Sequence, residues 1–329
     1  MAKTSYPVTR RDAMFALGAA ASLAPTARAQ ATYPSRPVRF VVPFAAATGA
    51  DIACRALTQD LAGVLGQSVV VDNRGGGAGS IGSVEIARAA PDGYTIGYGN
   101  VGTLAINRAL FSSLPYNPDA FTPIATMGRV QNVLVVRNDL PAKSVQQLID
   151  LARKSPGKLN MASGGNGTTG HLGGELFKAM AGVFMVHVPY RGAGQALTDL
   201  IGGSADLMFD NIASALPHIK AGRVRALGVS GAQRSPVLPE VPTIQEAGLK
   251  NYETAAWGGV VGPPGMAAEL VQRLNRDINR TLALPAVKER YAALAFEPMI
   301  SAPDALMALA RAEAPRWADV VRRSGAKMD

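Results

Sequence analysis

Short apolar runs alternate with segments of helical periodicity along the first part of the chain. The stretches Val38–Val42, Val69–Val71 and Tyr94–Tyr98 have the length of buried strands. Between them, Asp51–Leu65 carries apolar residues at four-residue spacing, and Ser80–Ala90 has a similar helical period. This alternation is typical of parallel strands with helices on both faces, so it predicts an α/β fold.

A second series of the same kind begins near Val133. Its expected strands are Val133–Val136, Leu159–Ala162, Phe184–Val188, Asp206–Phe209 and Val224–Val229, with helical periods between them. A proline-rich connector, Val237–Pro242, then precedes a late strand at Trp257–Val261 and further helices. We therefore expect two lobes joined by two crossings of the chain. The first lobe is expected to contain residues 30–131 and 257–329, and the second residues 132–256.

The N-terminal residues have the pattern of an export signal. Three basic residues come before an apolar stretch, Ala13–Ala24, and Ala27-Arg28-Ala29 then resembles a cleavage site. The apolar stretch is too short for a membrane-spanning helix, which needs roughly 20 residues. We therefore expect residues 1–29 to be a signal peptide and the mature protein to be periplasmic. The Arg10-Arg11 pair leaves both the general secretory and the twin-arginine export routes open.

Charge and composition exclude some classes of partner. The chain has 33 Lys and Arg residues against 24 Asp and Glu residues, and without residues 1–29 the counts are 29 and 23. This modest basic excess is spread along the chain, whereas nucleic-acid-binding proteins usually show a basic stripe or a motif. No nucleic-acid partner is therefore expected. The single cysteine, Cys54, excludes an intramolecular disulfide and is expected to be buried.

Signatures of catalysis are incomplete. Gly77–Gly82 fits the pattern G-x-G-x-x-G, but Gly97–Asn100 stands where a dinucleotide-binding protein would place its acidic residue. A structural glycine-rich turn is the preferred interpretation. The histidines His171, His187 and His218 are far apart in sequence and show no metal-ligand spacing. We therefore expect no cofactor, no metal ion and no enzymatic activity.

Polar, glycine-rich turns follow five of the expected strands. Open α/β sheets bind ligands at the carboxyl ends of their strands, and the N-terminus of a following helix favours an anion. The turns together predict a cleft for a small organic anion. The candidate ligand-binding residues are Phe44, Ala47, Thr48, Gly49, Asp51, Thr103, Asn166, Thr168, Thr169, His171, Arg191, Gly192 and Asp210.

Three of these residues carry more specific expectations. For His171, a contact with the ligand and the capping of its own helix are both open. For Asp210, a role in the cleft and the capping of the following helix are both open. Because Thr168 is expected on a loop, its replacement by alanine should weaken binding and leave folding nearly intact.

A set of motifs occurs in a fixed order over nearly the whole mature chain. They are Tyr33–Val38 followed by Val41–Phe44, Val71–Arg74, Ala89–Tyr94, Gly170–Leu172 running to Glu175–Phe177, Val188–Gly192, Met208–Asp210 and Leu238–Thr243. In order and spacing they resemble the substrate-binding receptors of tripartite tricarboxylate transporters, often called the Bug family. The resemblance implies a two-lobed type II periplasmic-binding-protein fold, in which each lobe is a mostly parallel sheet flanked by helices.

The resemblance also implies a function and partners. The two lobes would close over a small carboxylate, which then passes to a separate membrane permease, and the receptor would act as a monomer. An alternative within the same fold is a sensory module whose closed form docks on a receptor kinase.

One loop departs from the family's pattern. Where the family usually has Pro-Gly-Gly after Pro-Phe-x, this chain has Ala46-Ala47-Thr48. The loss of two glycines is expected to restrict the approach of the backbone to a carboxylate, while Thr48 adds a hydroxyl group.

Overall fold

The computed structural model describes residues 33–328. The chain divides into two compact units, Met1–Ser35 and Arg36–Asp329. In the first, the described residues are Tyr33–Ser35, and the Tyr33–Pro34 peptide bond is cis. The predicted signal peptide, residues 1–29, lies outside the described residues. All the described helices and strands belong to the second unit.

One half of the central sheet is built largely from the first part of the chain. Its strands are β1 (Val38–Val42), β2 (Val69–Asn73), β3 (Thr95–Asn100), β9 (Ala255–Gly262) and β10 (Phe296–Pro298), together with the first part of β4 (Thr122–Val136). β1 lies between β2 and β3 and is parallel to both. β9 is antiparallel to β3 and to β4, and β10 is antiparallel to β4.

The other half contains β5 (Asn160–Ser163), β6 (Val186–Pro189), β7 (Leu207–Asn211) and β8 (Arg225–Val229). β5 lies between β6 and β7 and is parallel to both. β7 and β8 pair antiparallel with the last part of β4. The strand β4 therefore belongs to both halves of the sheet.

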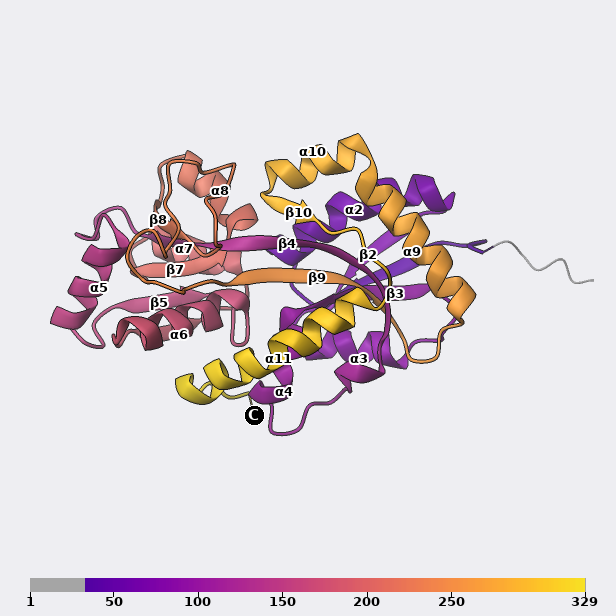
Figure 1. Cartoon of the computed structure of the whole chain (residues 1–329), viewed down its shortest axis with the longest axis horizontal. Coiled ribbons are helices and arrows are strands. Elements are labelled where there is room, and N and C mark those ends of the chain that lie inside the picture. The colour runs from indigo at the N-terminus through magenta and orange to yellow at the C-terminus, as the bar shows by residue number, and fades with distance from the viewer. Residues whose placement is uncertain (1–32, 329) are drawn as a thin grey trace, which may run out of the picture. The chain divides into compact units, whose positions relative to one another are not determined.

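β4 and β9 run side by side from one half of the sheet to the other (Figure 1). Their pairing extends from Thr122 opposite Gly262 to Gln131 opposite Ala255. The lobe boundaries proposed from the sequence, after residue 131 and before residue 257, fall at the end of this paired ribbon. The boundaries themselves remain a proposal.

Helices follow most strands of both halves. Those of the first half are α2 (Gly49–Leu65), α3 (Ser80–Arg88), α4 (Asn107–Leu110), α9 (Ala268–Ala283), α10 (Pro285–Ala293) and α11 (Ala305–Ser324), with helical turns at Gly77–Gly79, Gly102–Ile106 and Pro118–Ala120. Those of the second half are α5 (Val145–Lys154), α6 (Thr169–Ala181), α7 (Ala193–Ile201) and α8 (Ile212–Lys220). Within residues 33–328, no helix combines the length and apolar character needed to cross a membrane.

Most of the elements predicted from apolar periodicity are confirmed to within a few residues. The main exception is β4, which was predicted only at its end, Val133–Val136. The strand begins eleven residues earlier, at Thr122, and its register shifts twice against β9. Pro123 and Gly128 lie at these irregularities and interrupt the apolar run, so the sequence pattern does not indicate a strand there.

Each half of the sheet has its own buried apolar cluster. In the second half, the rings of Phe177, Phe209 and Tyr252 pack with centroids 5.4 to 6.3 Å apart. In the first half, Trp317 and Leu104 are almost completely buried. Replacing such an aromatic residue by alanine typically costs about 3–5 kcal/mol, so these clusters hold the loops above them in place. Cys54 is buried, as predicted.

Candidate ligand-binding cleft

A cavity of about 710 Å³ lies where strands from both halves of the sheet end. This volume is within the range of about 300–1,000 Å³ that is usual for small-molecule sites. Its walls are the segments after β1 (Phe44, Ala45, Thr48–Ala50), β2 (Gly75–Gly79), β3 (Asn100, Gly102), β5 (Gly164–Gly170) and β6 (Pro189–Ala193), with Phe209–Asn211 and Met328.

Most of the candidate residues lie on this wall: Phe44, Thr48, Gly49, Asn166, Thr168, Thr169, Arg191, Gly192 and Asp210. Ala47, Asp51, Thr103 and His171 are not among the lining residues. Asp51, Thr103 and His171 are buried, and each accepts a hydrogen bond from a backbone N–H group of a loop that lines the cavity or adjoins it. Thr103, for example, accepts a hydrogen bond from the Asn100 backbone N–H at 3.0 Å, at the end of β3.

Thr48 fixes the loop after β1. Its hydroxyl donates to the carbonyl oxygen of Ala45 at 2.9 Å and accepts from the backbone N–H of Asp51, at the start of α2. Thr48 is therefore the N-cap of α2 as well as a lining residue.

Asp51 lies behind the same loop. Its carboxylate accepts hydrogen bonds from the backbone N–H of Ala47 at 2.9 Å, from Asn73 at 2.9 Å and from Arg55 at 2.9 Å. Burial raises the pKa of Asp51, but the hydrogen bonds from Arg55, Asn73 and Ala47 outweigh it, so the pKa is below its ordinary value. Asp51 is thus an ionised anchor for the loop.

Ala47 has a backbone φ of 62°, in the left-handed region that glycine adopts most readily. This is one of the positions where the family usually has glycine. The loop thus keeps a glycine-like conformation with alanine in it. The hydrogen bond from the Ala47 N–H to Asp51 holds this conformation. That the loss of two glycines restricts the approach of the backbone to a carboxylate stays a prediction.

The glycine-rich loop after β2 also lines the cavity. Four successive residues, Gly76–Gly79, have positive φ values between 52° and 123°, which explains why three of them are glycine. From the sequence, this segment was expected to be a structural turn, and its residues are not among the candidate ligand-binding residues. Its position at the carboxyl end of a strand could have identified it as part of the site, because the turns that carry candidate residues also follow strands.

Thr168 and His171 organise the loop after β5. The Thr168 hydroxyl donates to the carbonyl oxygen of Gly165 at 2.8 Å and accepts from the His171 N–H at 3.2 Å, so it caps α6. The Nδ1 atom of His171 accepts from the N–H of Gly167 at 3.1 Å. His171 is only 3% exposed, and its ring holds the loop before α6; whether it also contacts a ligand stays open.

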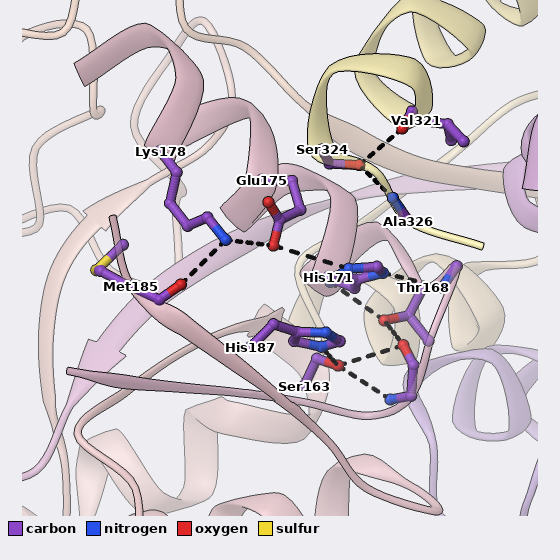
Figure 2. A network of polar contacts seen from close by, with 12 residues as sticks. Ser163, Thr168, His171, Glu175, Lys178, Met185, His187, Val321, Ser324 and Ala326 are labelled. Carbon is purple, nitrogen blue, oxygen red and sulfur yellow. Dashed lines mark hydrogen bonds and ion pairs between the residues drawn. The ribbon is translucent and has the colours of Figure 1, made fainter. Parts of the chain in front are cut away.

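A buried polar network supports this loop (Figure 2). The rings of His171 and His187 are stacked, with centroids 3.8 Å apart and an interplanar angle of 12°. His187 Nε2 lies 2.7 Å from the hydroxyl oxygen of Ser163, and Lys178 Nζ lies 2.7 Å from Glu175 Oε1. Burial, with a smaller effect of neighbouring cations, lowers the pKa of His171 to about 3 and that of His187 to about 4. Both rings are therefore neutral near pH 7.

The same cluster offers three potential metal-binding atoms. One donor atom each from His171, Glu175 and His187 lies within 4.8 Å of the others. The arrangement does not fit an ion, because the lone pairs of two parallel rings lie in separate planes and cannot both point at one centre. Lys178 already neutralises Glu175. Spacing in the sequence did not reveal this cluster, since the pairing of β5 with β6 creates it.

One basic side chain, Arg191, and one carboxylic acid, Asp210, are among the residues that line the cavity. Within residues 33–328, Arg191 has neither an ion-pair nor a hydrogen-bond partner. Asp210 accepts a hydrogen bond from the Ser214 hydroxyl, one turn into α8. Burial raises the pKa of Asp210 to about 7, although hydrogen bonds from Ser214 and the Asn211 backbone oppose the rise. Near pH 7 this carboxyl group is thus partly protonated and can donate a hydrogen bond.

Loops from the two halves of the sheet meet at the cavity. A β-carbon added to Gly49, at the start of α2, would lie 2.4 Å from Oδ1 of Asn211, at the end of β7. A β-carbon on Gly167 would lie 2.6 Å from Cδ2 of Leu110. Glycine at these two positions therefore allows the two walls of the cleft to come into contact.

Comparisons with known proteins agree with this geometry. Protein BugT of Bordetella pertussis is 37% identical over 299 residues, which cover 90% of this chain and 92% of BugT. The structure of R. palustris Rpa4515 with adipate has a TM-score of 0.87 and 38% identity, covering 90% of this chain and 100% of that one. The structure of MatC from Rhodopseudomonas palustris with bound malate has a TM-score of 0.82 and 34% identity, covering 88% of this chain and 100% of that one.

The structural neighbours include periplasmic binding proteins, which confirms the fold class predicted from the sequence. The sequence family described as "Tripartite tricarboxylate transporter family receptor" matches residues 53–326. The chain therefore belongs to the tripartite tricarboxylate transporter receptor family, the family that its motifs resemble.

Proposed function

We propose that this protein is a periplasmic receptor that captures a small organic carboxylate between its two lobes and delivers it to a membrane permease. The observation that carries the proposal is the cavity of about 710 Å³ into which loops of both halves of the sheet project. Two of the related structures contain adipate and malate, which are both dicarboxylates, and this supports a ligand of this class.

Helices of both halves of the sheet begin at the wall of the cleft. The lining residues include Gly49 at the start of α2, Thr169 at the start of α6, Ala193 at the start of α7 and Asn211 just before α8. Each helix start offers unpaired N–H groups and the positive end of its dipole, an effect of about 0.3–1 kcal/mol on a nearby negative charge. Their convergence favours an anion without any need for a cluster of basic side chains.

The charged groups of the cleft fit the same ligand. Arg191 supplies a cation with no protein partner among the described residues, and such a guanidinium group can bind a carboxylate with two parallel hydrogen bonds. The raised pKa of Asp210 reduces the repulsion that an ionised carboxylate would exert there. We assign Arg191 to a ligand carboxylate and Asp210 to a ligand oxygen.

Binding and release are the only steps that the proposal assigns to this chain, and it acts as a monomer with no cofactor. Native mass spectrometry of freshly purified protein tests the ligand class directly, because a retained acid adds its mass to the protein. A thermal-shift screen of organic acids complements it, since a ligand at 100 times its dissociation constant stabilises by about 2.7 kcal/mol. If no organic acid binds in either experiment, the proposal is wrong.

Delivery to a permease is tested separately in cells. Deleting the gene should abolish uptake of the acid that the purified protein binds, while growth on other carbon sources continues. Unchanged uptake together with a lost transcriptional response would instead indicate the sensory role.

A further inference from the structure

The segment that follows α11 reaches the ligand cavity. Gly325 ends the helix with a φ of 68°, and the chain then turns back. The Ala326 N–H donates to the Ser324 hydroxyl at 3.2 Å, and the Ser324 hydroxyl bonds to the Val321 carbonyl oxygen at 3.0 Å (Figure 2). The turn brings Met328 to the cavity wall.

The backbone holds Met328 in place there. Its N–H donates to the carbonyl oxygen of Leu110 at 2.9 Å, and it forms a parallel bridge with Phe111. The residue also packs against the apolar cluster of the first half of the sheet. Met328 is therefore a built part of the wall.

The loop after β5 touches neighbours of both Arg191 and Met328. The first residues of this loop touch the loop that carries Arg191, because β-carbons added to Gly164 and Gly165 would lie 3.2 and 3.1 Å from the backbone atoms Ala193 N and Tyr190 O. Farther along, Gly167 approaches Leu110, the residue that binds Met328. The loop after β5 thus contacts both the segment that carries Arg191 and the residue that binds Met328.

The side chain of Met328 differs from its neighbours on the wall. The other lining residues of the described chain are glycine, alanine and proline, polar or aromatic residues, and Arg191. A methionine side chain is apolar, unbranched and flexible, so it can fill a variable gap next to an apolar part of a ligand.

We propose that Met328 is the end wall of the cleft and sets the upper limit on the length of the acid that fits. This inference rests on the proposed function, because it places one ligand carboxylate at Arg191 and directs the carbon chain toward Met328. Removing the thioether side chain should open space for an acid with a longer carbon chain, and a bulkier residue should lower the maximum length of acid that fits.

The probe is a series of linear α,ω-dicarboxylates of increasing length, titrated calorimetrically into the mature protein. We expect Met328→Ala to shift the preferred acid to a longer one and to bind it roughly tenfold more tightly than the wild type does, as burial of one or two further methylene groups provides. Met328→Phe should shift the preference to shorter acids. Met180→Ala is the matched control, because Met180 lies on α6, is 37% exposed and does not line the cavity.

The outcomes separate the two claims. If the wild type binds acids of the series but Met328→Ala and Met328→Phe rank them as the wild type does, the end wall is refuted while the receptor function stands. If the wild type binds none of the series but binds another organic acid, the end wall is refuted while the receptor function stands; if it binds no organic acid at all, the proposed function fails and this inference fails with it. The end wall is supported if Met328→Ala comes to prefer longer acids and Met328→Phe shorter acids, while Met180→Ala keeps the preference of the wild type.

Discussion

Gly49→Ala tests whether the contact between the two walls of the cleft is part of the ligand-bound state. Gly49 is the first residue of α2 and has no positive φ, so alanine is compatible with its backbone. The added β-carbon would lie 2.4 Å from Oδ1 and 3.0 Å from Cβ of Asn211 on the opposite wall. The substitution therefore disturbs the approach of the two walls rather than the fold of either half.

The size of the effect follows from this distance. A separation of 2.4 Å is about 1 Å shorter than an ordinary contact, so the walls or the Asn211 side chain must move. Forcing an extra carbon into a packed contact typically costs about 1–3 kcal/mol. If that cost applies only when the cleft closes on its ligand, affinity should fall about 5- to 150-fold.

The assay is calorimetric titration of the bound acid, with the unfolding temperature of the ligand-free protein measured in parallel. Gly63→Ala is the matched control, because Gly63 lies on the same helix and a β-carbon there meets nothing within 4 Å. We expect Gly63→Ala to bind normally and to be more stable by up to about 1 kcal/mol. Adding Asn211→Ala to Gly49→Ala should restore part of the lost affinity in a double-mutant cycle. If Gly49→Ala binds as tightly as Gly63→Ala, the walls do not meet this way around the ligand.

Three further substitutions test the loops and the buried acid. The pKa of Asp210 is raised from 3.8 to about 7, so the stability that its protonated form provides is fully present below about pH 4 and is lost as the pH rises to about 7. Asp210→Asn should remove this pH dependence, so that its free energy of unfolding in urea gains up to about 4 kcal/mol relative to the wild type between pH 4 and pH 7. A difference in unfolding free energy between the two proteins that is the same at every pH would refute the shift. Thr168→Ala should lower stability by about 1 kcal/mol in the same assay, since it removes the cap of α6, and an unchanged midpoint would contradict that role. Ala47→Gly should relieve the left-handed alanine and raise stability by a few tenths to about 1 kcal/mol; a lower unfolding temperature would show that the loop is not strained.

The strands and helices were largely predictable, because the spacing of apolar residues along the chain follows directly from which face of each element is buried. Alternating strand and helix runs located β1, β5, β6, β7 and most helices. The polar turn after β6 and the end of β7 indicated Arg191 and Asp210, which line the cavity. The first part of β4 was not predictable, because proline and glycine occupy its irregular positions.

What the sequence could not show depends on contacts between distant segments. The stacking of His171 on His187 requires β5 and β6 to pair, and the position of Met328 requires a turn after α11. The sequence placed Thr168 on a loop and did not indicate that its hydroxyl caps α6; that its replacement leaves folding nearly intact stays a prediction. A turn residue and a helix cap look alike in sequence.

The central claim is that the cleft binds a small organic acid through its negative charge. The most direct measurement compares the acid retained by the purified protein with its methyl ester in calorimetric titrations at pH 7, for the wild type and for Arg191→Gln. Our account predicts that the ester loses most of the affinity of the acid in the wild type, and that the difference between ester and acid shrinks in Arg191→Gln. An ester that binds the wild type as tightly as the acid would contradict the account.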